Sequence, residues 1–252
     1  MPTYDNRVSE NNAMLANSAI TTSKSGALNE DVHLPGTSLY ELIDFISAEL
    51  PHWRDRPERP AVKSETALTS QLCAHLNSSA RHSVGWDFLQ FRIEEPDEVV
   101  KGRKIDLVPA PCGTTVWIEG RKHVDFDILL PIECKRLPTP KASDRDEREY
   151  VVSQYSTTGG IQRFKEGHHG AAHSLCAMIA YVQENPAKHW DACVCKWINE
   201  LVDSGQTGWN AKDVLYLLND DPATGIAVLR STHSRPDGLP DIEIRHLWVC
   251  VN

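Results

Sequence analysis

Three acidic residues and one lysine are the side chains of this sequence best suited to chemistry. Glu133 and Lys135 stand two residues apart in an apolar run, so an extended strand would project both from one face. Asp106 lies alone between two apolar residues, and Glu65 precedes a stripe of leucines at helical spacing. Packing does not account for a carboxylate and an amine at the end of an apolar strand. Carboxylates that meet beside a lysine can hold a divalent cation and stabilise developing charge.

The spacing of the acids indicates which of them can act together. A strand predicted over 124–136 has an apolar face formed by its even-numbered residues. Its other face carries Asp125, Asp127, Leu129, Pro131, Glu133 and Lys135. Asp127 precedes Glu133 by about 20 Å, at roughly 3.3 Å per residue, so the two could share a cation only if Pro131 marked a sharp bulge. Adjacent strands lie only about 4.8 Å apart, which makes Asp106 on the preceding strand the better partner.

Two other interpretations of these residues stay open. An isolated Glu-x-Lys pair is most often a surface ion pair on a half-exposed strand. Glu65 could stand in the first turn of its helix only because the helix dipole favours acidic residues there.

Hydrophobic periodicity predicts the elements that must position these side chains. Alternating patterns predict strands over 86–94, 103–109, 114–118, 124–136, 224–231 and 242–251, the last two around a turn at 236–238. Helical spacing predicts a helix from Ser38 that the Pro-rich stretch 51–60 ends, a second from Ser64, and others over 143–155, 171–182, from Pro186, and over 210–218. The predicted fold class is α/β (α+β), a mixed sheet flanked by helices, with additional C-terminal helices and a terminal β-hairpin.

The order helix Glu, strand Asp, strand Glu-x-Lys resembles the PD-(D/E)XK nuclease superfamily, which has the restriction-endonuclease-like fold. The resemblance rests on IleAspLeu at 105–107 and GluCysLys at 133–135, covers about 65–155, and has Ile105 where the family name has proline. It implies hydrolysis of phosphodiester bonds, by endonuclease or exonuclease action, with Mg²⁺ as cofactor and Mn²⁺ as a substitute. Small nucleases of this type often belong to microbial defence or repair systems. The resemblance implies catalytic roles for Glu65, Asp106, Glu133, Lys135 and Gln154.

The chemistry supports these residue types independently. Mg²⁺ prefers oxygen ligands and keeps several waters, so the carboxylates of Asp106 and Glu133 with the backbone carbonyl of Cys134 form the expected metal site. Lys135 would orient the nucleophile or stabilise the transition state. Gln154 lies on the stripe of the helix predicted over 143–155, where such nucleases often place a polar residue near the site.

Nucleic acid, with DNA expected, is the predicted partner. Arg163 follows paired glycines that could bind a phosphate, and Lys104 and Arg136 belong to short basic clusters beside the acidic strands. Solvated loops would explain the same residues. Because the formal net charge is -9, binding must be local or helped by a protein partner or a second copy.

Composition sets the remaining expectations. We expect a flexible arm over 1–36 and a single nuclease-like domain over 37–252, with a core at about 65–155 and an elaboration over 156–252. The seven cysteines are an odd number, which favours reduced thiols and a cytoplasmic protein. No apolar stretch reaches about 18 residues, so no membrane segment is expected. A catalytically inactive scaffold of the same fold is the main alternative. A zinc-binding regulatory protein using His189, Cys193 and Cys195 is a weaker one.

The N-terminal arm yields a test. Deletion of residues 1–30 should leave the melting temperature nearly unchanged, because this stretch lacks apolar periodicity and contributes little to a core. Thermal unfolding of the shortened and full chains measures this. A large fall in melting temperature would mean that the arm packs against the domain.

Overall fold

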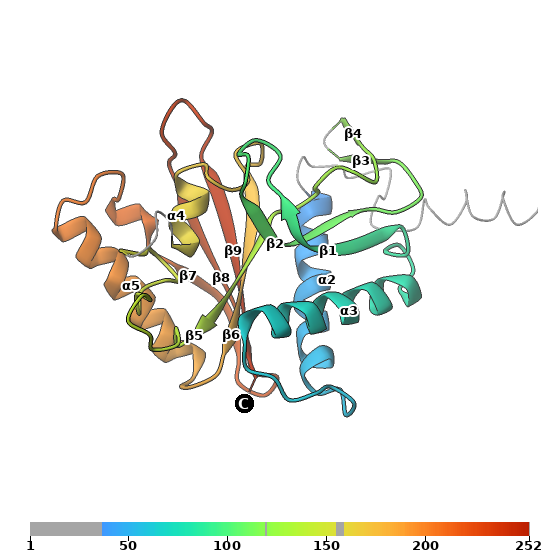
Figure 1. Cartoon of the computed structure of the whole chain (residues 1–252), viewed down its shortest axis with the longest axis horizontal. Coiled ribbons are helices and arrows are strands. Elements are labelled where there is room, and N and C mark those ends of the chain that lie inside the picture. The colour runs from blue at the N-terminus through green and yellow to red at the C-terminus, as the bar shows by residue number, and fades with distance from the viewer. Residues whose placement is uncertain (1–36, 119, 155–158, 252) are drawn as a thin grey trace, which may run out of the picture.

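The computed structural model describes residues 37–118, 120–154 and 159–251, so the predicted arm over 1–36 lies outside the described residues. The strands of the main sheet are β1 (Leu89–Pro96), β2 (Lys104–Pro111), β5 (Ile132–Leu137), β6 (Leu175–Val182), β7 (Tyr216–Asp221), β8 (Ile226–His233) and β9 (Ile242–Cys250). In space this seven-stranded sheet runs β1-β2-β5-β6-β9-β8-β7 (Figure 1). A separate hairpin pairs β3 (Val116–Ile118) with β4 (Arg121–His123).

The direction of the strands makes the sheet mixed, as expected. The central strands β5, β6 and β9 are parallel to one another. At each end of the sheet, two outer strands pair antiparallel with each other, β1 with β2 at one end and β7 with β8 at the other, and β2 and β8 also pair antiparallel with the central strands. The helices are α2 (Thr37–Arg54), α3 (Glu65–His82), α4 (Gly160–Lys165) and α5 (Ala187–Asp203), with a short 3-10 helix η1 (Ala211–Asp213). The predicted mixed α/β class is therefore confirmed at this level.

A hydrophobic cluster covers each face of the sheet, and β6 separates the two. Alternate β6 residues, such as Ile179, pack with α2 and α3, whereas Met178 and its even-numbered neighbours pack with α4 and α5. Every residue of β6 is buried. Figure 1 shows α2 and α3 on one side of the sheet and α4 and α5 on the other. Among the described residues, no helix has the length and apolar character that crossing a membrane requires.

Several predicted elements have the structure expected from their local signals. Ser64 caps α3 by accepting a hydrogen bond of 3.3 Å from the backbone nitrogen of Ala67. Helix α5 follows Pro186, and β8 and β9 flank a turn in which Asp237 and Gly238 adopt positive φ angles. Strands β1, β2 and β3 overlap their predicted ranges.

The helix predicted over 171–182 is wrong, because residues 175–182 form the central strand β6. A parallel strand buried on both faces is apolar at every position, so periodicity does not separate it from a buried helix. The helix predicted over 143–155 is also wrong for residues 143–154, which form turns. There the Asp146 carboxylate accepts hydrogen bonds from the backbone nitrogens of Arg148 and Gln154, an alternative to helical bonding.

Three further boundaries differ from expectation. The strand predicted over 124–136 starts only at Ile132, since Asp127 accepts from the backbone nitrogen of Val124 and closes a turn. Helix α2 continues through Pro51 to Arg54, where the buried Trp53 anchors its last turn. The helix predicted over 210–218 is limited to η1 and is followed by β7. The side chain of Ser38, the expected cap of α2, lies outside the described residues.

The burial of β6 predicts a large stability difference between two substitutions. Ile179→Ala should lower the free energy of unfolding by about 2–5 kcal/mol, because Ile179 is fully buried and its truncation leaves a cavity. Leu217→Ala on the edge strand β7, where Leu217 is 48% exposed, should change it by about 0.5 kcal/mol or less. Urea unfolding of both variants gives the comparison. Equal losses would contradict the central position of β6.

Candidate functional site

The candidate site lies where β2 and β5 part. These strands share one registered pair, Leu107 with Ile132, so the sheet opens beyond it. Asp106 and Glu133 are the next residues on each strand, and antiparallel pairing places them on the same face. Oδ2 of Asp106 accepts a hydrogen bond of 2.8 Å from the backbone nitrogen of Cys134. The carboxylate thus takes the place of a ladder bond that β2 no longer makes.

Glu65 acts on the same free edge of β5 from the first residue of α3. Its Oε2 accepts a hydrogen bond of 3.2 Å from the backbone nitrogen of Arg136. Asp106 and Glu65 therefore bind alternate outward N–H groups of β5, those of residues 134 and 136. The capping of α3 by Ser64 fixes where the helix begins and hence where Glu65 stands.

The ammonium of Lys135 lies among the three carboxylates. Its Nζ is 2.7 Å from Oε1 of Glu133, 3.4 Å from Oε1 of Glu65 and 3.9 Å from Oδ2 of Asp106. It also donates a hydrogen bond of 3.1 Å to the backbone carbonyl of Cys134. Burial disfavours the charged amine, but the carboxylates outweigh burial and hold the pKa of Lys135 above its usual range. The structure thus brings together four of the predicted catalytic residues.

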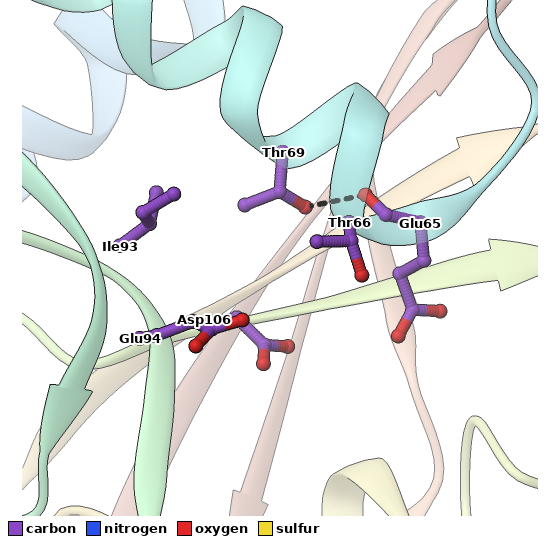
Figure 2. Close-up of a pocket in the computed structure, with 6 residues that line it drawn as sticks. All are labelled: Glu65, Thr66, Thr69, Ile93, Glu94 and Asp106. Atoms are coloured by element: carbon purple, nitrogen blue, oxygen red, sulfur yellow. Dashed lines mark hydrogen bonds between the residues drawn. The ribbon is translucent and has the colours of Figure 1, made fainter.

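A small pocket opens beside this cluster. It is lined by Glu65, Thr66, Thr69, Ile93, Glu94 and Asp106. Figure 2 shows the α3 side chains facing those of β1 and β2 across it. Asp106 and Glu65 keep 29% and 23% of their side chains exposed, so a ligand in the pocket could reach both carboxylates.

Glu133 lies behind this pocket and is fully buried. Its Oε1 pairs with Lys135 and with Arg163 of α4, while its Oε2 lies 3.3 Å from Nδ1 of His169. Burial alone would raise the pKa of Glu133, but the charge of Lys135, with His169 and Arg163, lowers it well below its usual range. Glu133 is therefore ionised between cationic groups.

Asp106 has the opposite electrostatic position. Burial, followed by the negative charge of Glu133, raises the pKa of Asp106 to about 7. Lys135 and the backbone nitrogen of Cys134 offset only part of this effect. The three carboxylates of the cluster thus face two permanent cations, Lys135 and Arg163, which leaves negative charge unbalanced when Asp106 is ionised.

The donors fit a hard divalent cation in kind. Asp106, Glu133 and the Cys134 carbonyl offer only oxygen atoms, and Oε2 of Glu133 is buried without a hydrogen-bond partner, although Nδ1 of His169 lies 3.3 Å away. Within the described ranges, no three His, Cys, Asp or Glu side chains are grouped to hold a metal ion. The expected set, with two carboxylates and one carbonyl, does not require three such side chains.

The other predicted site residues lie in different surroundings. Gln154 is exposed in a turn, and Lys104 forms an exposed ion pair of 2.9 Å with Glu94. The guanidinium of Arg136 donates to the backbone carbonyl of Lys63. Arg163, expected at a phosphate, instead contacts Glu133.

Two features of the cluster were not expected from the sequence. One is the contact of Arg163 with Glu133, and the other is the approach of His169. Gly170, with a φ of 62°, brings the His169 segment so close to Pro131 that an added Cβ would lie 3.0 Å from its ring. A glycine is a weak signal of such a close approach. Among the proposed zinc ligands, Cys193 contacts His189, whereas Cys195 contacts Asp191.

The charge imbalance predicts how stability depends on pH in the absence of divalent ions. An acid whose pKa is raised by folding binds its proton more tightly in the native state, so stability falls as pH rises from about 4 to about 7. Asp106→Asn should flatten this fall and be at least as stable as the wild type at pH 8. Urea unfolding of both proteins in EDTA over this range is the measurement. An Asp106→Asn variant clearly less stable than the wild type at pH 8 would contradict the raised pKa of Asp106.

Comparison with family models, curated proteins and solved structures finds no match to this chain. The resemblance therefore rests on the motif residues, and function has to be argued from the geometry of the cluster.

Proposed function

We propose that this chain is a metal-dependent nuclease of the PD-(D/E)XK type that hydrolyses phosphodiester bonds, with DNA as the expected substrate. The observation that carries the proposal is the meeting of Glu65, Asp106 and Glu133 around the Lys135 ammonium where β2 and β5 part. An open end of a mixed sheet, covered by the first turn of a helix, agrees with the arrangement that the motif implies.

A divalent cation held by Asp106, Glu133 and the Cys134 carbonyl would activate a water and offset charge on the phosphate. The chain's own groups supply the rest. The Asp106 carboxylate lies at the pocket wall, where a phosphate oxygen and an attacking water can approach it. Lys135 stays protonated, so its ammonium can stabilise a developing oxyanion. Arg163 of α4 donates a hydrogen bond to Glu133 and fixes the orientation of its carboxylate.

Binding of the substrate cannot depend on a general positive surface. The formal charge of -9 opposes approach of a polyanion, so contacts must come from a few groups near the pocket. Lys104 and Arg136 lie on β2 and β5, the strands that carry Asp106 and Glu133. A protein partner or a second copy would supply further positive charge.

A second function, that of an inactive scaffold with the same fold, has a specific observation in its favour. Glu133 is fully buried and does not line the pocket, while Asp106 and Glu65 bind backbone N–H groups of β5. Acids that only complete the edge of a strand would have the same contacts. Activity measurements separate the two functions.

Asp106→Asn is the sharpest test of the nuclease proposal. It should abolish cleavage that requires Mg²⁺ or Mn²⁺, because it removes a ligand charge while retaining the shape of the side chain. Lys135→Ala should lower kcat by about 100-fold or more, the scale of losing one electrostatic group, with divalent-ion binding largely retained. The assay incubates plasmid, linear and single-stranded DNA, and RNA, with each ion or with EDTA.

The controls address folding. Glu133→Gln should also abolish cleavage, but its buried position makes thermal unfolding an essential companion measurement. Asp127→Asn is the matched control, since Asp127 only closes a turn and an amide oxygen can still accept that bond. Wild-type rates for folded Asp106→Asn protein would disprove the assignment of the site. If wild type cuts no substrate, even with its partners, the scaffold function replaces the nuclease.

A further inference from the structure

Helix α4 brings Arg163 to Glu133, yet it has only six residues. A helix this short is not stable by itself, because nucleation is unfavourable and few of its N–H groups bond within it. The position of Arg163 therefore depends on what holds α4 at each end.

The first turn of α4 is held by backbone bonds. The nitrogens of Gly160, Ile161 and Gln162 donate to the carbonyls of Glu149, Tyr150 and Val151, at 2.8, 3.0 and 3.0 Å. These bonds satisfy N–H groups that a helix start leaves free. Glycine is needed for the close approach, since an added Cβ on Gly160 would lie 2.7 Å from the Tyr150 carbonyl oxygen.

The last residue of α4 is held by an ion pair. Nζ of Lys165 lies 2.8 Å from Oδ1 of Asp213, and both side chains are buried. Nζ also donates to the backbone carbonyl of Ser234. The other oxygen of Asp213 accepts from the backbone nitrogen of Asn210, which caps η1.

A buried line of side chains joins Tyr150, whose carbonyl binds the first turn of α4, to Asp213, which pairs with the last residue of α4. Its successive hydrogen bonds are Trp248 Nε1 to Tyr150 Oη at 2.8 Å, Tyr150 Oη to His246 Nδ1 at 2.8 Å, His246 Nε2 to Ser231 Oγ at 2.8 Å, Ser231 Oγ to His233 Nε2 at 2.7 Å, and His233 Nδ1 to Asp213 Oδ1 at 2.7 Å. All of its members are 1% exposed or less.

The chemistry of the two ends fixes the direction of these bonds. The Asp213 carboxylate only accepts, so Nδ1 of His233 carries the proton. Burial lowers the pKa of His233 and of His246, so both rings are neutral. Nε2 of His233 then accepts from Ser231, and Ser231 accepts from Nε2 of His246. Nδ1 of His246 accepts from Tyr150, whose oxygen accepts from the indole of Trp248. Each hydroxyl and each ring therefore has one arrangement.

We propose that this line of hydrogen bonds is a clamp on α4, in which Tyr150, Ser231, His233 and His246 are positioning residues for Arg163 and, through it, for Glu133. The consequence for cleavage rests on the proposed nuclease function, whereas the placement of α4 does not. Because each group accepts from one neighbour and donates to the next, the loss of one link leaves buried donors and acceptors unpaired. The clamp thus transmits a local loss to both ends of α4.

Ser231→Ala is the smallest change that breaks the line. It should reduce hydrogen-exchange protection of the α4 backbone amides by about tenfold or more, the scale of an unpaired buried polar group. Ser79→Ala is the matched control, because Ser79 donates a hydrogen bond of 2.6 Å to Glu49 between α2 and α3, on the other face of the sheet. It should leave α4 protected. Ser231→Thr, which retains the hydroxyl, should leave the α4 amides as protected as in the wild type.

Cleavage gives the second measurement. Ser231→Ala should lower kcat with little change in KM, because Arg163 acts on the site and not on distant substrate contacts. In an Arg163→Gln background the same substitution should have no further effect on kcat, since both act through one contact. If Ser231→Ala does not fold, Tyr150→Phe breaks the line at another link and takes its place.

The outcomes separate this proposal from the nuclease itself. Unchanged α4 protection in both line-breaking variants would overturn the clamp, whatever the enzyme does. Losses of kcat that add to that of Arg163→Gln would also overturn it, since they would indicate general loosening. Lost α4 protection in a protein whose wild type cleaves nothing would support the clamp and reject the nuclease function.

Discussion

The burial of one ammonium, that of Lys135, is the constraint on which the rest of this site depends. An ammonium removed from water needs negative partners nearby, or its charged form becomes too costly to keep. Here the partners come from three elements, Glu133 from β5, Asp106 from β2 and Glu65 from α3. These elements are thereby tied to one point. Helix α3 must begin beside β5, and the part of β2 that ends at Asp106 must lie apart from β5, next to the contact of Leu107 with Ile132.

The parting of the strands creates a second requirement that the same acids meet. A strand edge that loses its neighbour exposes N–H groups that need acceptors. Asp106 and Glu65 accept from the backbone nitrogens of residues 134 and 136, so each acid stabilises both the edge of β5 and the buried amine. This double use accounts for a carboxylate that keeps its place although burial and Glu133 raise its pKa to about 7. The acids thus complete the fold and also keep reactive groups at the pocket.

The sequence indicated one half of the cluster because hydrophobic packing leaves a periodic pattern. The leucine stripe of α3 and the alternation of residue types over 132–135 in the sequence place Glu65, Glu133 and Lys135 by simple geometry. The same reasoning failed for 171–182, where burial on both faces removes the periodicity that distinguishes a strand from a helix. It failed for 143–154 because a side chain, that of Asp146, replaces backbone partners. Both helix predictions thus fail where hydrophobic periodicity alone does not determine the backbone structure.

The other half of the cluster rests on polar contacts, which leave no pattern at all. Arg163 and His169 reach Glu133 from a short helix and the segment after it, and no spacing in the chain relates them to residue 133. Helix α3, with 18 residues and a continuous apolar stripe, is held in place along its length by packing. Helix α4 has six residues and needs Tyr150 and Asp213, which lie far apart in sequence. Hydrophobic burial therefore positions the helix that carries Glu65 on the pocket side of the site, whereas the inner side depends on hydrogen bonds whose partners only the folded chain brings together.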